Sequence, residues 1–471
     1  MTLFNNPILD SDSYKYSHFL QYPPDTLNVT SYIEARAGGE FDKLVFFGLQ
    51  GFLKRYFTQP ITLQMIDEAE QIISAHGLPF NRGGFTWIVE QHGGFWPVEI
   101  EALPEGLVVP TGIPLVQIKA TDDQLPWLPS FLETQLLRAV WYPTTVATLS
   151  WHAKQVIAGH LNRTCDDPDP VLPFRLHDFG ARGTTSKEQS QIGGAAHLVN
   201  FMGTDTVQGL LWAKQYYGAD MPGFSIPAAE HSTMTAWGEA RETDAYRNMV
   251  EQFGGDGRLV AVVSDSYDIY HAVKEIWGTQ LKSLVESNGG TVVVRPDSGD
   301  PTKVPVDVLD MLMEIFGSRR NGKGYKVLPD CIRVIQGDGM DLPTIGQLLN
   351  NLTERKISAE NIAFGMGAGL LQKVNRDNLR FAQKANAVLA NADRYGDDPV
   401  WTDVRKTVKT DPSKSSKAGI QAVTRDNSGI WKSAKADTVP VSANLLEPVY
   451  RNGEILRDQT FEEVRANTLL A

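Results

Sequence analysis

The sequence contains few cysteines, no excess of positive charge and no long apolar run. Only two of its 471 residues are cysteines, Cys165 and Cys331, which excludes a disulfide framework and favours a reducing compartment. Lys and Arg number 44 against 56 Asp and Glu, and the net charge of -12 argues against a nucleic-acid surface or an acidic-membrane anchor. No apolar stretch reaches membrane-spanning length, and no signal-peptide pattern opens the chain. We therefore expect a cytoplasmic protein with neither nucleic acid nor a membrane as its partner.

Common catalytic motifs are missing as well. The sequence has no HExxH pattern or Cys/His cluster for zinc, and no G-x-S-x-G turn for a nucleophilic serine. The segment GSRRNGKG (317–324) has the spacing of a P-loop, but Gly324 replaces the Ser/Thr that binds the metal. It also follows a predicted helix, whereas a P-loop follows a strand. We interpret it as a surface loop.

One pattern recurs between about residues 172 and 370. A short apolar run ends in Gly, Asp, Ser, Arg or His, and a helical stretch often follows, which is typical of parallel strands. Two helical stretches, 267–277 and 306–316, are expected to end at the glycines that follow them, Gly278 and Gly317. The apolar runs are 174–180, 198–205, 223–231, 259–266, 291–299, 332–339 and 361–369.

These runs predict an α/β fold that contains a β/α barrel or an incomplete barrel, with a doubly wound open sheet as the rival. Residues 97–120 alternate apolar and charged side chains between Pro/Gly turns, which predicts an antiparallel sheet outside the barrel. We expect an N-terminal α+β segment (1–145) with this sheet and a barrel-like catalytic domain (146–385). The C-terminal segment (386–471) is expected to pack on the N-terminal one.

Polar residues gather where the predicted strands end. RPDSG (295–299) and GDG (337–339) could each be a helix-capping turn, but together they would place acceptors for ribose hydroxyls beside donors for a phosphate. GMGAGL (365–370) lacks the third glycine of a dinucleotide fingerprint, and is either a phosphate loop or a tight turn. A single histidine is most often a buried, satisfied residue, but His231 stands out because it ends the run AAEH (228–231). Taken singly, Phe179 is more simply interpreted as a packing residue.

Taken together, these motifs resemble the nicotinamide phosphoribosyltransferase family, within the type II phosphoribosyltransferases. The resemblance extends over nearly the whole chain and implies transfer of phosphoribosyl from phosphoribosyl pyrophosphate to nicotinamide in NAD salvage. It also implies Mg²⁺ as cofactor, ATP as co-substrate and a homodimer with shared active sites. The matching segments include DSYKYSHFLQYPP, WYPTTVAT, LHDFGARG, AAHLVNFMGTDTV, PAAEHSTMTAWG, VVSDSYDIY, RPDSG, RVIQGDG and NIAFG.

The resemblance implies roles for individual residues. Nicotinamide would stack between Phe179 and Tyr14 of the partner subunit, and Asp205 would accept from its carboxamide, near Arg295. His231 would accept a phosphoryl group from ATP, oriented by Asp265. The implied catalytic set is His231, Asp265, Asp297 and Arg295. The implied ribose and phosphate set is Arg182, Asp297, Gly337, Asp338, Gly367, Ala368, Arg376 and Lys384, and the implied pyrophosphate or ATP set is Arg36 and Lys406. No residue is assigned as a metal ligand.

Two positions differ from the animal members of the family. The loop reads GMGAG and not GSGGG, so Ala368 adds a methyl group where the backbone would meet phosphate. Ala181 replaces an aromatic residue between Phe179 and Arg182. Three other functions stay open: a nicotinate phosphoribosyltransferase, a phosphate-binding barrel that isomerises or decarboxylates a sugar phosphate, and a non-catalytic binding protein. Asp205 argues against the first, because its carboxylate would repel that of nicotinate.

Overall fold

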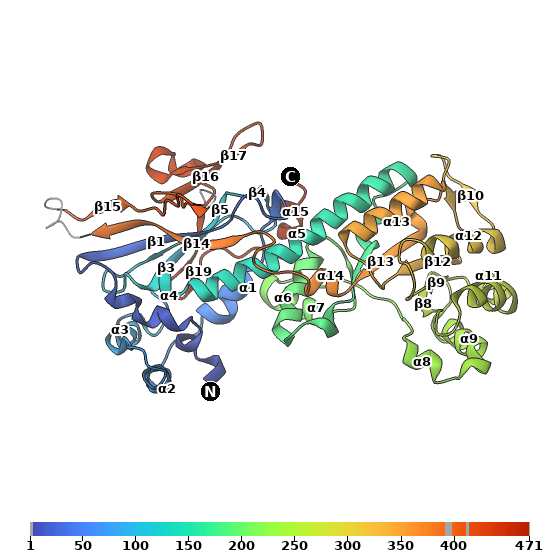
Figure 1. Ribbon diagram of the computed structural model, residues 1–471, viewed down its shortest axis with the longest axis horizontal. Coiled ribbons are helices and arrows are strands. Elements are labelled where there is room, and N and C mark those ends of the chain that lie inside the picture. Colours follow the sequence, from blue (N-terminus) through green and yellow to red (C-terminus); the bar gives the residue numbers. More distant parts are fainter. Residues whose placement is uncertain (1–2, 391–397, 411–413, 471) are drawn as a thin grey trace. The chain divides into compact units, whose positions relative to one another are not determined.

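The computed structural model describes residues 3–390, 398–410 and 414–470, and the chain divides into two compact units (Figure 1). Unit 1 comprises Met1–Thr148, Trp212–Ala219 and Asn375–Ala471, and unit 2 comprises Leu149–Leu211 and Asp220–Val374. Two helices contribute residues to both units: α5 (Glu133–Thr164) and α7 (Val207–Tyr217). Among the described residues, no helix combines the length and apolar character needed to cross a membrane.

Unit 2 contains a parallel sheet. In the part of the chain that the structure describes, six strands lie in the order β7, β6, β13, β12, β9 and β8, and every neighbouring pair is parallel. Valine and isoleucine dominate β8, β9 and β12, and most of these side chains are buried, as in strands covered on both faces. The bounds are β6 Leu176–Asp178, β7 Gly203–Thr204, β8 Leu259–Val263, β9 Thr291–Arg295, β12 Ile332–Gln336 and β13 Ile362–Met366.

The segment 223–229 connects the two edges of this sheet. Phe224 pairs with Gly203 of β7, and Ala228 pairs with Ala261 of β8, each as a single parallel bridge. The strands and this segment together confirm the prediction of an incomplete β/α barrel, and not a doubly wound open sheet. Its interior holds a cluster of apolar side chains: Ala261, Val293 and Ile335, with Phe179, Ile226 and Ala363 packed against them.

Helices follow most of these strands. Helix α12 (Val304–Phe316) ends at Gly317, whose φ is 81°, as predicted. The helix expected to end at Gly278 instead continues through η8 (Ala272–Gln280), a π-helical stretch. A Cβ on Gly278 would lie 2.8 Å from Cδ1 of Ile315, so this glycine allows close packing against α12 and does not end the helix. The other helices are α6 Lys187–Leu198, α8 His231–Thr235, α9 Glu242–Phe253, α10 Ile269–His271, α11 Lys282–Ser287, α13 Leu342–Glu354 and α14 Ala368–Leu371.

Two of the predicted strands are wrong in extent. In 198–205, helix α6 continues to Leu198 and β7 is left with two residues. Residues 223–231 form only the two single bridges described above. Pro227 has no N–H for a ladder hydrogen bond, and α8 begins at the end of this segment.

The GSRRNGKG segment forms a surface hairpin, in agreement with the interpretation as a loop. Its strands are β10 (Arg319–Arg320) and β11 (Lys326–Val327). Nζ of Lys323 donates to the carbonyls of Asn162 and Cys165, at 2.8 and 2.5 Å. This lysine therefore caps the C-terminal end of α5, where positive charge is favourable.

Unit 1 contains an antiparallel sheet formed by both ends of the chain. Within the described residues its seven strands lie in the order β15, β14, β1, β5, β3, β18 and β19, and all neighbours are antiparallel. Strand β14 pairs with β1, and β18 with β3, so N- and C-terminal segments of the chain build this antiparallel sheet together, as the predicted fold class has it. The bounds are β1 Thr26–Ala35, β3 Val98–Ala102, β5 Pro114–Ala120, β14 Phe381–Ala390, β15 Val400–Asp403, β18 Glu447–Arg451 and β19 Glu454–Ile455.

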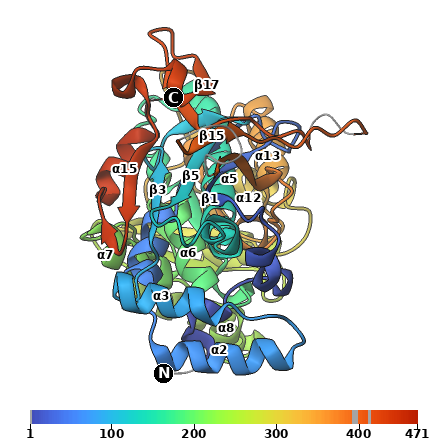
Figure 2. The same cartoon turned by 90° about the vertical axis from the view of Figure 1, so that its left-hand side faces the viewer.

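Two small two-stranded sheets and several helices complete unit 1. Figure 2 shows α2 and α3 on the side of the sheet opposite to β17. The core combines aliphatic and aromatic side chains, and the buried Tyr450 hydroxyl donates to the carbonyls of Phe57 and Trp96 at 3.2 and 3.3 Å. The remaining elements are β2 Lys43–Val45 with β4 Val108–Pro110, β16 Gln421–Arg425 with β17 Trp431–Lys435, and α1 Leu49–Phe52, α2 Leu63–Ala75, α3 Arg82–His92, α4 Leu128–Phe131 and α15 Phe461–Asn467.

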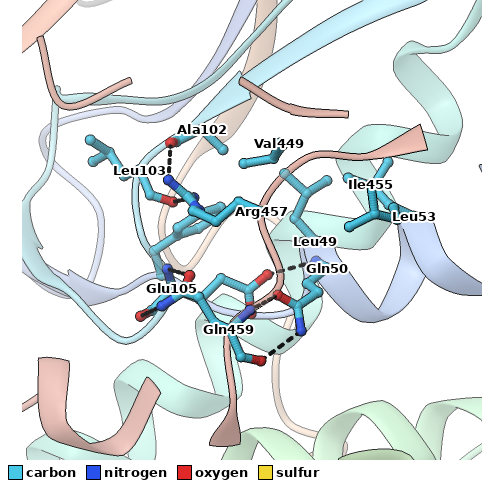
Figure 3. A pocket seen from close by; sticks show the side chains of 11 residues that line it. Leu49, Gln50, Leu53, Ala102, Leu103, Glu105, Val449, Ile455, Arg457 and Gln459 are labelled. Atoms are coloured by element: carbon cyan, nitrogen blue, oxygen red, sulfur yellow. Dashed lines mark hydrogen bonds between the residues drawn. The ribbon is translucent and has the colours of Figure 1, made fainter. Parts of the chain in front are cut away.

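A small cavity, lined mostly by apolar side chains, lies within unit 1 (Figure 3). Its volume of about 10 Å³ is room for roughly one water molecule. Glu105 beside it is buried, and its carboxylate accepts from the backbone N–H groups of Gly48 and Gln50 at 2.9 and 2.7 Å. Burial raises the pKa of Glu105. The side chain of Gln50 accepts from the backbone of Gln459 at 2.7 Å. These hydrogen bonds join the C-terminal region of the chain to the N-terminal region. None of the site residues predicted from the sequence lines the cavity.

Candidate active site

The predicted site residues of unit 2 follow the carboxyl ends of its parallel strands. Because parallel strands run in the same direction, these ends meet at one edge of the sheet, where barrel enzymes hold their active sites. The structure places Phe179 after β6, Asp205 after β7, Asp265 after β8, Arg295 and Asp297 at the end of β9, Gly337 and Asp338 after β12, and Gly367 and Ala368 after β13.

Asp265 is the centre of a hydrogen-bond network on this edge. Its Oδ1 atom lies 2.9 Å from Nε2 of His231. Its Oδ2 atom accepts from the backbone N–H of Asp297 at 3.1 Å and from the hydroxyl of Ser298 at 2.5 Å. The Asp265 side chain is 4% exposed and that of His231 is 46% exposed. A buried carboxylate thus holds one nitrogen of an accessible imidazole ring.

Arg295 and Asp297 form a two-bond ion pair beside this network. Nε and one terminal nitrogen of Arg295 donate to the two carboxylate oxygens of Asp297, at 3.1 and 2.8 Å. Oδ2 of Asp297 also lies 4.0 Å from Nδ1 of His231. The GDG turn follows β12, and Nε2 of Gln336 donates to the carbonyl of Asp338 at 2.8 Å. Each carboxylate oxygen has two lone pairs, so Asp297 retains capacity to accept from substrate hydroxyls.

The half-buried ring of Phe179 lies against two glycines. A Cβ on Gly365 would lie 2.0 Å from Cε2 of this ring, and one on Gly337 would lie 3.2 Å from the same atom. A side chain at position 365 would overlap the ring, and one at position 337 would press against it, so glycine at both positions makes room for Phe179. The hypothetical Cβ of Gly337 also lies 3.4 Å from Oδ1 of Asp297. The aromatic platform and the Arg295–Asp297 pair are consequently neighbours.

Asp205 presents an exposed carboxylate next to the Phe179 segment. Its backbone N–H donates to the carbonyl of Asp178 at 2.9 Å, and Asp178 directly precedes Phe179. The hydroxyl of Ser225 donates to Oδ1 of Asp205 at 2.6 Å. The backbone hydrogen bond anchors the residue, and Ser225 holds one oxygen of its carboxylate, which suits a group that must accept from a ligand.

The proposed phosphate loop and Arg182 lie in neighbouring segments. Gly367 precedes α14 and Ala368 begins it, and α14 packs against η6 (Ala181–Gly183), which carries Arg182. Nε2 of Gln372 donates to the carbonyl of Gly180 at 2.8 Å and so joins the two segments. Both Arg182 and Ala368 are exposed.

The predicted basic residues of unit 1 lie close to one another. The pKa of Lys384 is lowered, first by burial and then by the positive charges of Arg36, Lys406 and Arg376, while the negative charge of Glu133 opposes the shift. Mutual repulsion of these cations would be relieved by a polyanion. The cluster is therefore suited to phosphate groups.

Tyr14 lies on η3 (Ser13–Leu20), a 3₁₀ helix of unit 1. The neighbouring Lys15 is 2% exposed and forms an ion pair with Glu133, which fixes this segment. The Tyr14 side chain is 58% exposed. Its aromatic face is therefore accessible on an anchored segment.

The whole chain is similar to phosphoribosyltransferases. Residues 174–454 match the model of the nicotinate phosphoribosyltransferase family, and residues 6–100 match that of the nicotinamide phosphoribosyltransferase N-terminal domain. A nicotinamide phosphoribosyltransferase from Xanthomonas campestris pv. campestris is 50% identical over 472 residues, which cover 99% of each chain. The chain belongs to the nicotinamide phosphoribosyltransferase family. It is thus an enzyme of the phosphoribosyltransferase class.

Solved structures agree with this family in fold. A nicotinate-nucleotide pyrophosphorylase from Pyrococcus furiosus has a TM-score of 0.60 and 15% identity, over 99% of this chain and 95% of that one. Human nicotinic acid phosphoribosyltransferase has a TM-score of 0.53 and 16% identity, over 98% of this chain and 93% of that one. At these identities the likeness concerns the fold alone.

Two residues that lie next to the predicted site residues were not predicted from the sequence. One is Ser225, whose hydroxyl holds Asp205 and whose only signal was its place in the segment 223–231. The other is Asp178, which is buried and accepts from the backbone N–H of Gly180 at 2.7 Å. Burial, the largest cause, raises the pKa of Asp178 to about 6. Its only signal was an acidic residue inside the strand that precedes Phe179.

Proposed function

We propose that this enzyme transfers the phosphoribosyl group of phosphoribosyl pyrophosphate to nicotinamide, and forms nicotinamide mononucleotide and pyrophosphate in NAD salvage. The observation that carries the proposal is the exposed Asp205 carboxylate, held by Ser225 next to the Phe179 segment. A carboxylate accepts from the N–H groups of an amide and repels the carboxylate of nicotinate. The Phe179 ring offers a face for the flat pyridine. The site thus favours nicotinamide over nicotinate.

This reaction needs no general base. The pyridine nitrogen carries a lone pair that forms the new bond to the anomeric carbon, while the bond from that carbon to pyrophosphate breaks. We expect positive charge on the ribose ring and growing negative charge on the leaving group, as in glycoside cleavage. The protein positions the two reactants and stabilises charge, which explains carboxylates and cations in a site without a nucleophilic Ser or Cys.

The ribose and its phosphates have matching partners. Asp297, in its ion pair with Arg295, would accept from ribose hydroxyls together with the GDG turn of Gly337 and Asp338. The 5′-phosphate would lie at the segment of Arg182, Gly367 and Ala368. This segment offers backbone N–H groups and the guanidinium of Arg182, and both are good hydrogen-bond donors to phosphate.

Mg²⁺ fits the donor set of this site when it comes with the pyrophosphate. Among the described residues, no group of three or more His, Cys, Asp or Glu side chains could hold a metal ion unaided. Mg²⁺ commonly uses one or two carboxylates plus substrate phosphates, and the carboxylates of Asp265 and Asp297 both approach the ring of His231, at 2.9 and 4.0 Å. The ion would neutralise charge on the leaving pyrophosphate.

ATP would stimulate the reaction through phosphorylation of His231. Asp265 hydrogen-bonds one ring nitrogen and so leaves the lone pair on the other one. Attack of this nitrogen on the γ-phosphorus forms an N–P bond, breaks the bond to the bridging oxygen and releases ADP. The Asp265 carboxylate stabilises the cationic ring. Transfer of the phosphoryl group to water completes net hydrolysis of ATP.

A homodimer would complete each site. Tyr14 and the basic cluster of Arg36, Arg376, Lys384 and Lys406 would serve the active site of the partner subunit, where Tyr14 covers the second face of nicotinamide and the cations bind the phosphates.

Both cysteines are free, which supports a reducing, cytoplasmic location.

The variant His231→Ala tests the ATP step. We expect slow synthesis of nicotinamide mononucleotide that no longer responds to ATP, and no ATP hydrolysis above background, because the phosphoryl acceptor is gone. Nucleotide product and ADP are measured in the same reaction. If the variant still hydrolyses ATP in step with product formation, another residue is the acceptor.

A further inference from the structure

The hydroxyl of Ser298 makes a contact that the reaction described above does not use. It donates to Oδ2 of Asp265 at 2.5 Å, although Ser298 itself is exposed at the rim of the barrel. The other oxygen of the same carboxylate holds His231 at 2.9 Å. Ser298 thus lies one hydrogen bond away from the residue that orients the phosphoryl acceptor.

The orientation of Asp265 depends on few donors. A carboxylate can turn about its Cβ–Cγ bond unless both oxygens are held. Here Oδ2 accepts from the Ser298 hydroxyl and, at the longer distance of 3.1 Å, from the backbone N–H of Asp297. Hydrogen bonds to charged groups are stronger than those between neutral groups, and shorter ones are typical of them. The serine hydroxyl is the nearer of the two donors to Oδ2, and it is the one that a side-chain substitution can remove.

Both donors belong to the loop that would bind ribose. Asp297 and Ser298 are consecutive residues after β9, and Arg295 fixes the carboxylate of Asp297. A shift of this loop on substrate binding would move the Ser298 hydroxyl with it. Through Asp265, such a shift would reach the ring of His231.

We propose that Ser298 is a positioning residue that couples the ribose-binding loop to the phosphoryl-accepting His231 by fixing the carboxylate of Asp265. The inference rests on the proposed ATP step. Ser298 contacts Asp265 and acts on the imidazole ring only through that carboxylate. Its loss should therefore change the rate of His231 phosphorylation and the ratio of ATP hydrolysed to product formed.

The experiment uses the full-length enzyme and four serine variants. Ser298→Ala removes the hydroxyl, and Ser298→Thr retains it. Ser225→Ala is the matched control for the other half of the site, because Ser225 holds the carboxylate of Asp205 in the same way at 2.6 Å. Ser287→Ala is a surface control on α11, where the exposed hydroxyl donates to the carbonyl of Ser283. The readouts are phosphohistidine formed from γ-labelled ATP, ADP per nicotinamide mononucleotide, and the separate KM values for nicotinamide and ATP.

We expect Ser298→Ala to slow phosphohistidine formation by roughly ten-fold, the scale of one hydrogen bond to a charged group. The stimulation by ATP should fall by a similar factor, and Ser298→Thr should restore most of both. Ser225→Ala should instead raise the KM for nicotinamide and leave phosphohistidine formation as in the unmodified enzyme. Ser287→Ala should match the unmodified enzyme in every readout.

Three results would overturn the inference, and they are distinguishable. If the unmodified enzyme forms no phosphohistidine, the proposed ATP step fails and this inference fails with it. If the unmodified enzyme is labelled and Ser298→Ala is labelled at the same rate, only this inference is wrong. Equal losses of phosphohistidine in Ser298→Ala and Ser298→Thr would show that the hydroxyl is not what matters. If Ser298→Ala does not fold, Ser298→Cys carries the same test, because its thiol is a weak donor of similar size.

Discussion

Replacing Gly365 by alanine should weaken nicotinamide binding selectively. The added Cβ would lie 2.0 Å from Cε2 and 2.2 Å from Cδ2 of the Phe179 ring, far inside contact distance. Because the ring packs on the barrel interior, it can relieve this clash only by leaving its present position. If one stacking face is worth about 1 to 3 kcal/mol, its loss raises the KM for nicotinamide roughly 5- to 150-fold.

The assay measures KM for nicotinamide and for phosphoribosyl pyrophosphate separately, and we expect the larger change in the first. Gly346→Ala on α13 is the matched control, since its Cβ would meet nothing nearer than Cγ1 of Val156 at 3.8 Å. In a Phe179→Ala background, Gly365→Ala should add little, because the clashing ring is gone. A folded Gly365→Ala enzyme with an unchanged KM for nicotinamide would refute this reasoning.

Three further predictions follow from the same site. Asp205→Ala should reduce efficiency with nicotinamide by roughly 1.5 to 3 kcal/mol, the range for hydrogen bonds to charged groups, and unchanged kcat/KM would remove its role. Mixing inactive Phe179→Ala and Tyr14→Ala chains should restore some activity through mixed dimers, and no recovery despite subunit exchange would contradict a shared site. Burial raises the pKa of Asp178 from 3.8 to about 6, so the unfolded chain loses this proton first and the folded state loses stability as pH rises through that range. Asp178→Asn should therefore gain stability relative to the unmodified enzyme between pH 4 and 7, by at most about 3 kcal/mol, and a pH-independent difference in unfolding free energy would contradict this.

Much of the barrel could be predicted from the sequence because its strands carry a local signal. The runs of β8 and β9 are rich in valine and are followed by polar residues, and both are strands in the structure. The run 223–231 carries a similar apolar signal but forms only single bridges. There Pro227 and the start of α8 prevent a ladder, so local composition alone overestimates the strand.

The contacts that orient the site could not be predicted in this way. The hydrogen bonds from Ser225 to Asp205 and from Ser298 to Asp265 join residues 20 and 33 positions apart. Such pairs depend on how side chains meet at the edge of the sheet, which periodicity does not encode. The raised pKa of Asp178 likewise arises from burial, which only the packed structure reveals. By contrast, the positions of Phe179 and Asp297 after their strands follow from the strand ends themselves.

The most direct test of the account compares nicotinamide, nicotinate and quinolinate as acceptors of phosphoribosyl pyrophosphate, each with and without ATP. The account predicts equal amounts of nicotinamide mononucleotide and pyrophosphate from nicotinamide, an increase on adding ATP, and kcat/KM for nicotinate lower by at least about ten-fold, as one mismatched charged contact implies. A preference for nicotinate or quinolinate, or no pyrophosphate from nicotinamide, would contradict it.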